Sequence, residues 1–280
     1  MFSKERYDGT HIRNQDFFTH ILPYTKPART DSVIVFEQEY DITKTLRYIQ
    51  EKNVKFTRIF LYAMLRSITL MPKINRFVSG LRYYQRNRIA FTFKEEDSDI
   101  TMSFSPLLPF EKFCDNIQNH SLPQEIETEA TKTEKRKEKI FSIIKKLPRF
   151  LTRFLIWGVK FLDYHNALPI SFTNSLPFYS TLILTTIGDT DIDSTYYHNL
   201  KIGTCGIFCT IGKIKNINGQ NKVKLTFTYD DRITSSSYFT QAIDLVRNLV
   251  ENPEQLETPL ELTTEQLVKL GLSEKELNNI

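Results

Sequence analysis

The sequence predicts a two-layer α/β (α+β) sandwich, in which helices cover a mixed β-sheet. Three observations support this fold class. Strand patterns and helix patterns interleave along the chain. Residues 56–71 are apolar on every side, which is typical of a helix buried at the centre of a domain. Asn218-Gly219 lies between two strand patterns and favours a tight antiparallel turn, so the sheet is not wholly parallel.

The elements of the first half follow from hydrophobic periodicity and from breaker residues. Pro23 and Pro27 limit helix formation, so the first 30 residues are expected to be mostly loops. Thr43 is expected to be the N-cap of a helix that runs to about residue 52, and Pro72 ends the helix over 56–71. The other expected elements are a strand at 32–40, a hairpin of 82–85 and 88–94 around Arg86-Asn87, a strand at 99–105 and a helix at 110–120.

The second half begins with charged helices and returns to strands. A charged helix is expected over 131–146, and Pro148 separates it from a second helix over 150–164. Three strand patterns and one helix pattern follow, at 180–187, 206–214, 222–229 and 238–251 respectively. The alternation of these elements completes the predicted sandwich.

Bulk composition describes an ordinary globular protein. The 280 residues are 40% hydrophobic, 25% charged and 12% aromatic, enough for one large core or two modest ones. No run approaches the ~18 apolar residues of a membrane span, and the first ten residues do not resemble a secretory signal. Three cysteines without a CxxC pair suit a reducing compartment, so we expect a cytoplasmic protein.

One motif near the C-terminus carries a family resemblance. Residues 225–239 read Leu-Thr-Phe-Thr-Tyr-Asp-Asp-Arg-Ile-Thr-Ser-Ser-Ser-Tyr-Phe, and a helix and Asn252-Pro253 follow. This resembles the end of the dihydrolipoyl acyltransferase catalytic domain, where a strand leads into Asp-His-Arg-x-x-Asp-Gly, a helix and Leu-x-Asn-Pro. Asp230 and Arg232 match that motif. Asp231 stands where the catalytic histidine belongs, and Ser235 replaces the second aspartate.

Further blocks extend the resemblance over roughly residues 30–255. Residues 181–188 resemble the strand that ends in Ser-Asn-Leu-Gly, and residues 206–213 resemble the strand Ala-Ile-Leu-Gly-x-Gly-Lys. Residues 41–75 resemble the progression from Asp-Val-Thr to Pro-x-Leu-Asn. The chain thus resembles the chloramphenicol acetyltransferase and dihydrolipoyl acyltransferase superfamily, in a subgroup whose catalytic histidine is replaced. Residues 83–87, Tyr-Tyr-Gln-Arg-Asn, and the run that ends Leu-Asp-Tyr-His165 match neither parent pattern and are interpreted as marks of this subgroup.

The resemblance implies a chemistry. In this superfamily the histidine takes a proton from a thiol or hydroxyl, which attacks an acyl-CoA thioester, while a Ser or Thr hydroxyl stabilises the oxyanion. In that superfamily the active site lies between subunits of a trimer. The resemblance therefore implies a homotrimer, a coenzyme A thioester as substrate and no covalently bound cofactor. It also implies that Thr185 and Thr186 lie in the region of the helper hydroxyl.

Each candidate site residue also has a structural interpretation. Asp231 is a poor base, because a carboxylate of pKa ~4 draws weakly on a thiol of ~8.5; Asp230-Asp231 reads more simply as the cap of a turn. Thr185 and Thr186 are also residues that favour strands, and Ser235 is the first residue of a polar run typical of a helix N-terminus. His198, between two of the family strands, is a second candidate base or a solvated loop histidine. No His, Cys or Asp grouping has metal spacing, so no metal site is expected.

A basic segment admits other functions. Residues 132–160 carry ten Lys and Arg against two Glu, a local charge of +8, which leaves −4 for the rest of the chain. Lys145, Lys146, Arg149 and Arg153 alternate with Phe, Leu and Trp, which is the composition of an interfacial membrane helix. The same helix could bury its apolar stripe on its own domain, and we favour that interpretation. Nucleic acid is the weakest option, because the remainder of the chain is acidic.

These observations lead to three hypotheses. The first is a catalytically degenerate acyltransferase-like domain with a binding or scaffold role. The second is an active CoA-dependent acyltransferase whose base has moved to His198 or Asp231. The third is a peripheral membrane or assembly protein that works through residues 145–160. We expect an acyltransferase-like domain over 1–255, with its core at 30–255 and a basic helical insertion at about 131–165. A tail of two short helices over 256–280 is expected to dock, since helices this short are marginal alone.

Overall fold

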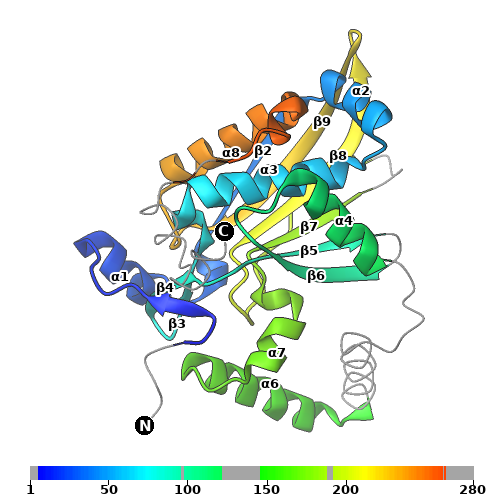
Figure 1. The fold of residues 1–280 in the computed structure, drawn as a ribbon. Helices are drawn as coiled ribbons and strands as arrows, with labels where there is room; N and C mark the ends of the chain where they lie inside the picture. Colours follow the sequence, from blue (N-terminus) through cyan, green and yellow to red (C-terminus); the bar gives the residue numbers. More distant parts are fainter. Residues whose placement is uncertain (1–5, 96–97, 122–145, 188–191, 261, 263–280) are drawn as a thin grey trace.

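Six strands form one mixed sheet, and three form a smaller sheet beside it (Figure 1). The computed structural model describes residues 6–95, 98–121, 146–187, 192–260 and 262. The main sheet has the order β2-β9-β8-β7-β5-β6; β7 runs parallel to both β5 and β8, and the other pairs are antiparallel. Its strands are β2 (Val33–Asp41), β5 (Ile89–Glu95), β6 (Ser98–Phe104), β7 (Leu182–Thr186), β8 (Ile207–Ile217) and β9 (Gln220–Asp230). The predicted mixed sheet is confirmed.

Helices cover one face of this sheet and enclose the core. They are α2 (Thr43–Lys52), α3 (Phe56–Leu70), α4 (Phe110–Ser121) and α8 (Ser236–Glu251) (Figure 1). Twelve residues of α3, from Arg58 to Thr69, are buried, so α3 is the predicted central helix. The hydroxyl of Ser67 on α3 donates to the Ala242 carbonyl of α8 at 2.7 Å, which fixes the two helices against each other. The core therefore lies between the sheet and α3, as the sandwich requires.

The predicted turn at Asn218-Gly219 joins β8 to β9. Ile217 pairs with Gln220 across it. Asn218 and Gly219 have φ angles of 53° and 82°, the left-handed pair that a two-residue hairpin needs and that Asn-Gly adopts readily. The long β8–β9 hairpin brings the end of β9 back beside the start of β8.

The expected hairpin around Arg86-Asn87 is wrong. Arg86 ends β4 (Arg82–Arg86), which pairs with β1 (Gly9–His11) and β3 (Arg76–Ser79) in the small sheet. The chain then crosses to β5 of the main sheet. The actual turn is Gly80-Leu81 between β3 and β4, with φ angles of 55° and 61°. Arg86-Asn87 resembles a turn locally, but the Arg86 side chain is fully buried, so this point is a crossing between sheets.

Two other local expectations need correction. The first 30 residues contain β1, helix α1 (Phe17–Thr25) and a short 3-10 turn (Arg29–Asp31), because Asp16 caps α1 by accepting a hydrogen bond from the Thr19 amide at 2.9 Å. Thr43 is the first helical residue of α2 rather than its cap. The N-cap is Ile42, which makes no side-chain capping bond, and the Asp41 carboxylate before it accepts from the Thr43 amide at 3.0 Å.

The basic segment forms α6 (Arg149–Tyr164), which with α7 (Ile170–Ser175) lies apart from the helical layer (Figure 1). No residue of α6 is buried, so the expected packing of its apolar stripe on its own domain is wrong. Phe150, Phe154 and Trp157 are 74%, 65% and 57% exposed. Short 3-10 turns complete the described elements, at Pro72–Asn75, Pro177–Tyr179 and Pro253–Leu256. None of the described helices is long and apolar enough to cross a membrane.

Several predictions fall on residues outside the described ranges. These are most of the charged helix over 131–146, including Lys145, and nearly all of the tail over 256–280. Lys146 is described and exposed. The described start of the tail is fixed to the domain, because Arg66 of α3 donates to the carbonyl oxygens of Gln255 and Leu256 at 2.9 and 3.0 Å.

Candidate functional site

The end of β9 carries a buried ion pair. Arg232 donates through Nε and a terminal nitrogen to the two carboxylate oxygens of Asp230, at 2.9 and 2.7 Å. Asp230 also accepts from the Ser32 hydroxyl at 2.8 Å. Arg232 in turn donates to the carbonyl oxygens of Lys26 and Pro27, at 3.1 and 3.2 Å. These bonds tie the end of β9 to residues 26–32.

Asp231 lies in the turn that follows β9. Its amide donates to the Ser32 carbonyl at 2.8 Å, and its carboxylate is paired with the Lys26 ammonium. The side chain is 17% exposed, and its Oδ1 is buried with no hydrogen-bond partner in the described part of the chain. Asp231 is therefore an ion-paired residue of the turn, with one polar atom left unsatisfied.

Thr185 and Thr186 lie elsewhere along the sheet. Thr185, Thr210 and Thr226 are level across β7, β8 and β9, and the Thr185 hydroxyl is 3.2 Å from that of Thr210. Asp230 is four residues further along β9 than Thr226, which corresponds to roughly 13 Å at ~3.3 Å per strand residue. One chain thus does not bring these hydroxyls to Asp231.

The other two candidates also stay separate from Asp231. Ser235 is the N-cap of α8 and accepts from the Tyr238 amide at 3.4 Å, as the polar helix start predicted. His198 lies exposed in the segment between β7 and β8. No hydrogen bond among the described residues joins His198 or Ser235 to Asp231. Of the candidate residues, the structure brings together Asp230, Asp231 and Arg232.

A cleft of about 320 Å³ opens beside Arg232. Four segments form its walls: residues 27–29, the β3–β4 turn, the C-terminal end of α6 and residues 201–203. Its lining includes four cations and one acid, namely Arg29, Lys160, Lys201, Arg232 and Asp163. The sequence patterns missed Arg29 and Lys201, since isolated cations in loops carry no local signal. Only the fold places them in one cleft.

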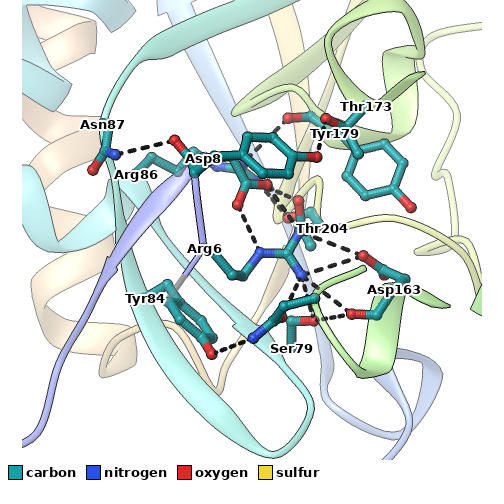
Figure 2. Close-up of polar contacts among 12 residues, drawn as sticks. Arg6, Asp8, Ser79, Tyr84, Arg86, Asn87, Asp163, Thr173, Tyr179 and Thr204 are labelled. Carbon is teal, nitrogen blue, oxygen red and sulfur yellow. Dashed lines mark hydrogen bonds and ion pairs between the residues drawn. The ribbon is translucent and has the colours of Figure 1, made fainter. Parts of the chain in front are cut away.

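A buried arginine anchors one wall of this cleft (Figure 2). Arg6 donates to both carboxylate oxygens of Asp8, at 2.6 and 2.9 Å, and to Ser79 at 2.8 Å. It also reaches Asn166 at 3.0 Å and the Asp163 carboxylate at 3.3 Å. Burial raises the pKa of Asp163 despite the charge of Arg6. The small sheet is thereby held to the end of α6.

A second buried arginine joins the small sheet to residues 179–204. Arg86 is 1% exposed and donates to the Tyr179 and Thr204 carbonyl oxygens at 2.9 and 2.5 Å. Burial lowers its pKa to about 10. Nearby, the Asn166 amide donates to the Tyr84 hydroxyl at 3.1 Å (Figure 2). The two sequence runs that matched neither parent pattern, 83–87 and the one ending at His165, thus meet in one polar cluster.

The described residues hold no metal centre. They contain no group of three or more His, Cys, Asp or Glu that could bind a metal ion. Cys114, Cys205 and Cys209 are buried free thiols, and burial raises the pKa of each. Cys209 on β8 and Cys205 just before it are both buried in the core.

Comparisons with known proteins agree with the fold. No protein-family model matches the sequence, and no curated protein matches it. Among solved structures, a chloramphenicol acetyltransferase superposes with a TM-score of 0.53 at 12% identity, over 87% of this chain and 98% of that one. A probable dihydrolipoamide acetyltransferase of Listeria monocytogenes gives 0.52 at 11% identity, over 90% and 98%. The truncated catalytic core of a 2-oxoacid dehydrogenase complex from Thermoplasma acidophilum gives 0.50 at 12%, over 87% and 99%. The chain has the chloramphenicol acetyltransferase-like fold that its motifs predicted.

Proposed function

We propose that this chain is an acyltransferase-fold domain that has lost acyl-transfer chemistry and acts as a binding or scaffold protein. One observation carries the proposal. The Asp230–Arg232 pair that frames the family motif is intact, with 2.7 and 2.9 Å hydrogen bonds, while the residue between them is an aspartate paired with Lys26. The two residues on either side of position 231 match the family motif, and an aspartate replaces the histidine of that motif.

Asp231 is unsuited to the task of the histidine. A general base works best when its pKa lies near the working pH, whereas a carboxylate titrates near 4 and a thiol near 8.5. The Asp231 carboxylate is also already paired with the Lys26 ammonium. Ser235 caps α8, so it does not assist a base. Loss of general-base help costs about 10²–10⁴-fold in rate, which would leave a protein that binds without turnover.

The rival hypothesis is an active enzyme whose base is His198 or Asp231. Acetyl transfer from acetyl-CoA to a small thiol and to a small alcohol tests both hypotheses. We expect the wild-type protein, Asp231→Ala and His198→Ala to give the same background rate. We also expect no recovery in Asp231→His, because Lys26 still lies beside the new side chain and Ser235 still replaces the second aspartate of the motif. Robust wild-type transfer that either alanine variant abolishes would overturn the degenerate assignment and identify the base.

We propose further that the domain is a cytoplasmic homotrimer with an affinity for acyl-CoA. The support for the trimer is that Thr185 and Thr186 lie roughly 13 Å or more along the sheet from Asp231, so a shared site needs a second subunit. The support for a reducing compartment is that the three cysteines are unpaired.

A second candidate function is attachment to an anionic membrane surface through α6. Phe150, Phe154, Trp157 and Phe161 recur at helical spacing, and their exposed fractions fall from 74% to 42% along the helix. Phe154 and Phe161 stack on the two sides of Trp157, with ring centroids 5.7 and 5.5 Å away. The charges of α6 are three cations, Arg149, Arg153 and Lys160, and one acid, Asp163, which binds Arg6. An exposed aromatic stripe flanked by cations fits the interface of an anionic bilayer.

Trp157 makes this candidate directly testable, because it is the one tryptophan of the chain. With vesicles that contain phosphatidylserine, we expect a blue shift of its fluorescence and co-sedimentation of the protein, both weakened by salt. Phe150→Ser/Phe154→Ser should abolish both effects. Phe17→Ser/Phe18→Ser is the matched control, since these α1 side chains are 71% and 73% exposed. Equal binding by the two variants, or equal binding to neutral vesicles, would contradict the attachment.

A further inference from the structure

The cleft beside Arg232 has an excess of positive charge. Arg29, Lys160, Lys201 and Arg232 line it, and two carboxylates, Asp163 and Asp230, face these cations. Asp163 already interacts with Arg6, whose own charge Asp8 balances. No ion pair within the described residues involves Lys160 or Lys201. The cleft therefore keeps a surplus of two positive charges.

We propose that this cleft binds a small organic anion with a carboxylate or phosphate head and an apolar body. The proposal rests on the binding role proposed above and gives it a ligand class. The experiment below measures ligand binding and not acyl transfer. A failure of the ligand proposal is therefore distinguishable from a failure of the proposed function, which acyl transfer would show.

Arg29 has one side-chain nitrogen whose hydrogen-bonding capacity is unsatisfied. One terminal nitrogen donates to the Gly203 and Ile202 carbonyl oxygens at 2.8 and 3.3 Å, and Nε lies 4.0 Å from Asp230. The other terminal nitrogen is buried with no hydrogen-bond partner in the described residues. Asp230 does not supply one, because its carboxylate approaches Arg29 at Nε, beyond hydrogen-bond distance at 4.0 Å. Burial lowers the pKa of Arg29, the expected consequence of a charge without a full partner. An anion in the cleft would supply the charge partner that Arg29 lacks.

The rest of the lining sets the size and polarity of the ligand. Val78, Leu81 and Ile202 contribute apolar surface, and the volume of about 320 Å³ is at the low end of the ~300–1,000 Å³ typical of small-molecule sites. Two walls are tight turns that only glycine allows. A Cβ on Gly80 would lie 2.6 Å from the Tyr164 carbonyl oxygen, and one on Gly203 would lie 2.2 Å from that of Phe178. Cations beside apolar walls favour an amphipathic organic anion over an inorganic ion.

Calorimetric titration with matched probes tests the proposal. Phenyl phosphate and phenylacetate carry the two head groups, and 2-phenylethanol is the neutral analogue. We expect saturable 1:1 binding of at least one anion with a Kd of roughly 1 mM or tighter, weakened by salt, and no saturable binding of the alcohol. The anion that binds more tightly identifies the head group.

Variants locate the binding. Lys160→Gln/Lys201→Gln should weaken anion binding at least tenfold without loss of folding, because both side chains are exposed. Arg29→Gln should weaken it by at least as much, and the lysine pair keeps the test valid if Arg29→Gln does not fold. Lys112→Gln, an exposed cation on α4, is the control and should bind like the wild type. Binding of the neutral alcohol as tight as the anions, absence of anion binding, or equal affinities for the lysine pair and the control would overturn the proposal.

Discussion

At the scale of single residues, buried arginines organise this protein. Arg6 and Arg86 connect segments that are distant in sequence, and Arg232 does the same for the end of β9. Arg86 has no carboxylate partner among the described residues, and it is satisfied by the Tyr179 and Thr204 carbonyl oxygens instead. Its guanidinium also lies 4.6 Å from the centre of the Phe77 ring. A charge held in this way by backbone carbonyls depends on the position of the backbone, so it makes the crossing from β4 to β5 specific.

Arg86→Ala should therefore destabilise the fold strongly. The change leaves a cavity and two buried carbonyl oxygens without their donor, and we expect a loss of more than about 3 kcal/mol in the free energy of unfolding. Arg82→Ala, on the same strand but partly exposed, should cost less than about 1 kcal/mol. Urea denaturation of both variants measures the difference. Similar losses in the two variants would mean that Arg86 does not anchor the crossing.

At the scale of elements, charged contacts join the start of α3 to the end of β5. Glu95, at the end of β5, accepts from Lys55 at 2.6 Å and from Arg58 of α3 at 3.0 Å. Burial opposes ionisation of Glu95, but these hydrogen bonds and charges outweigh it and hold the pKa below its ordinary value. The ionised form is therefore favoured in the folded state, and the contact stabilises the protein above the ordinary glutamate pKa.

This arrangement predicts a pH dependence. The contribution of Glu95 is present at neutral pH and is lost as the pH falls below 4.5 through the lowered pKa of the folded state. Glu95→Gln should lower the free energy of unfolding by roughly 1–3 kcal/mol at pH 7 and by much less near pH 3. Urea unfolding at both pH values measures this. A difference between variant and wild type that does not change with pH would show that the charge of Glu95 is not responsible.

At the scale of the whole molecule, the aromatic stripe of α6 is an exposed apolar surface. A membrane or a second copy of the chain could cover it. The cleft lining takes Lys160, Asp163 and Tyr164 from α6 and none of the stripe aromatics, so occupation of the cleft does not require coverage of the stripe.

We expect a particle of about three chain masses, each of 32.9 kDa, in light scattering at micromolar concentration. The double variant Phe154→Ser/Trp157→Ser tests whether the α6 stripe contacts a membrane or a neighbouring subunit. An unchanged mass together with lost vesicle binding would assign the stripe to a membrane, whereas a fall in mass would assign it to the subunit contact. A stable wild-type monomer would contradict the inherited trimer.

Local patterns in the sequence were sufficient for much of the fold. The buried helix α3, the Asn218-Gly219 turn and the Ser235 cap each depend on residues within a few positions of one another, so periodicity and turn preference predict them. The sequence alone thus determined the fold class.

Tertiary structure decided what depends on residues far apart in the chain. Arg86-Asn87 resembles a turn until the burial of Arg86 shows a crossing between sheets. The α6 stripe has the pattern of a packed helix, and only the absence of a facing element within the described domain leaves it exposed. The cleft joins Arg29, Lys160, Lys201 and Arg232 from four segments, and Arg6 reaches Asp163 across 157 positions. Such contacts have no local signature, because their free energy comes from which segments the completed fold places side by side.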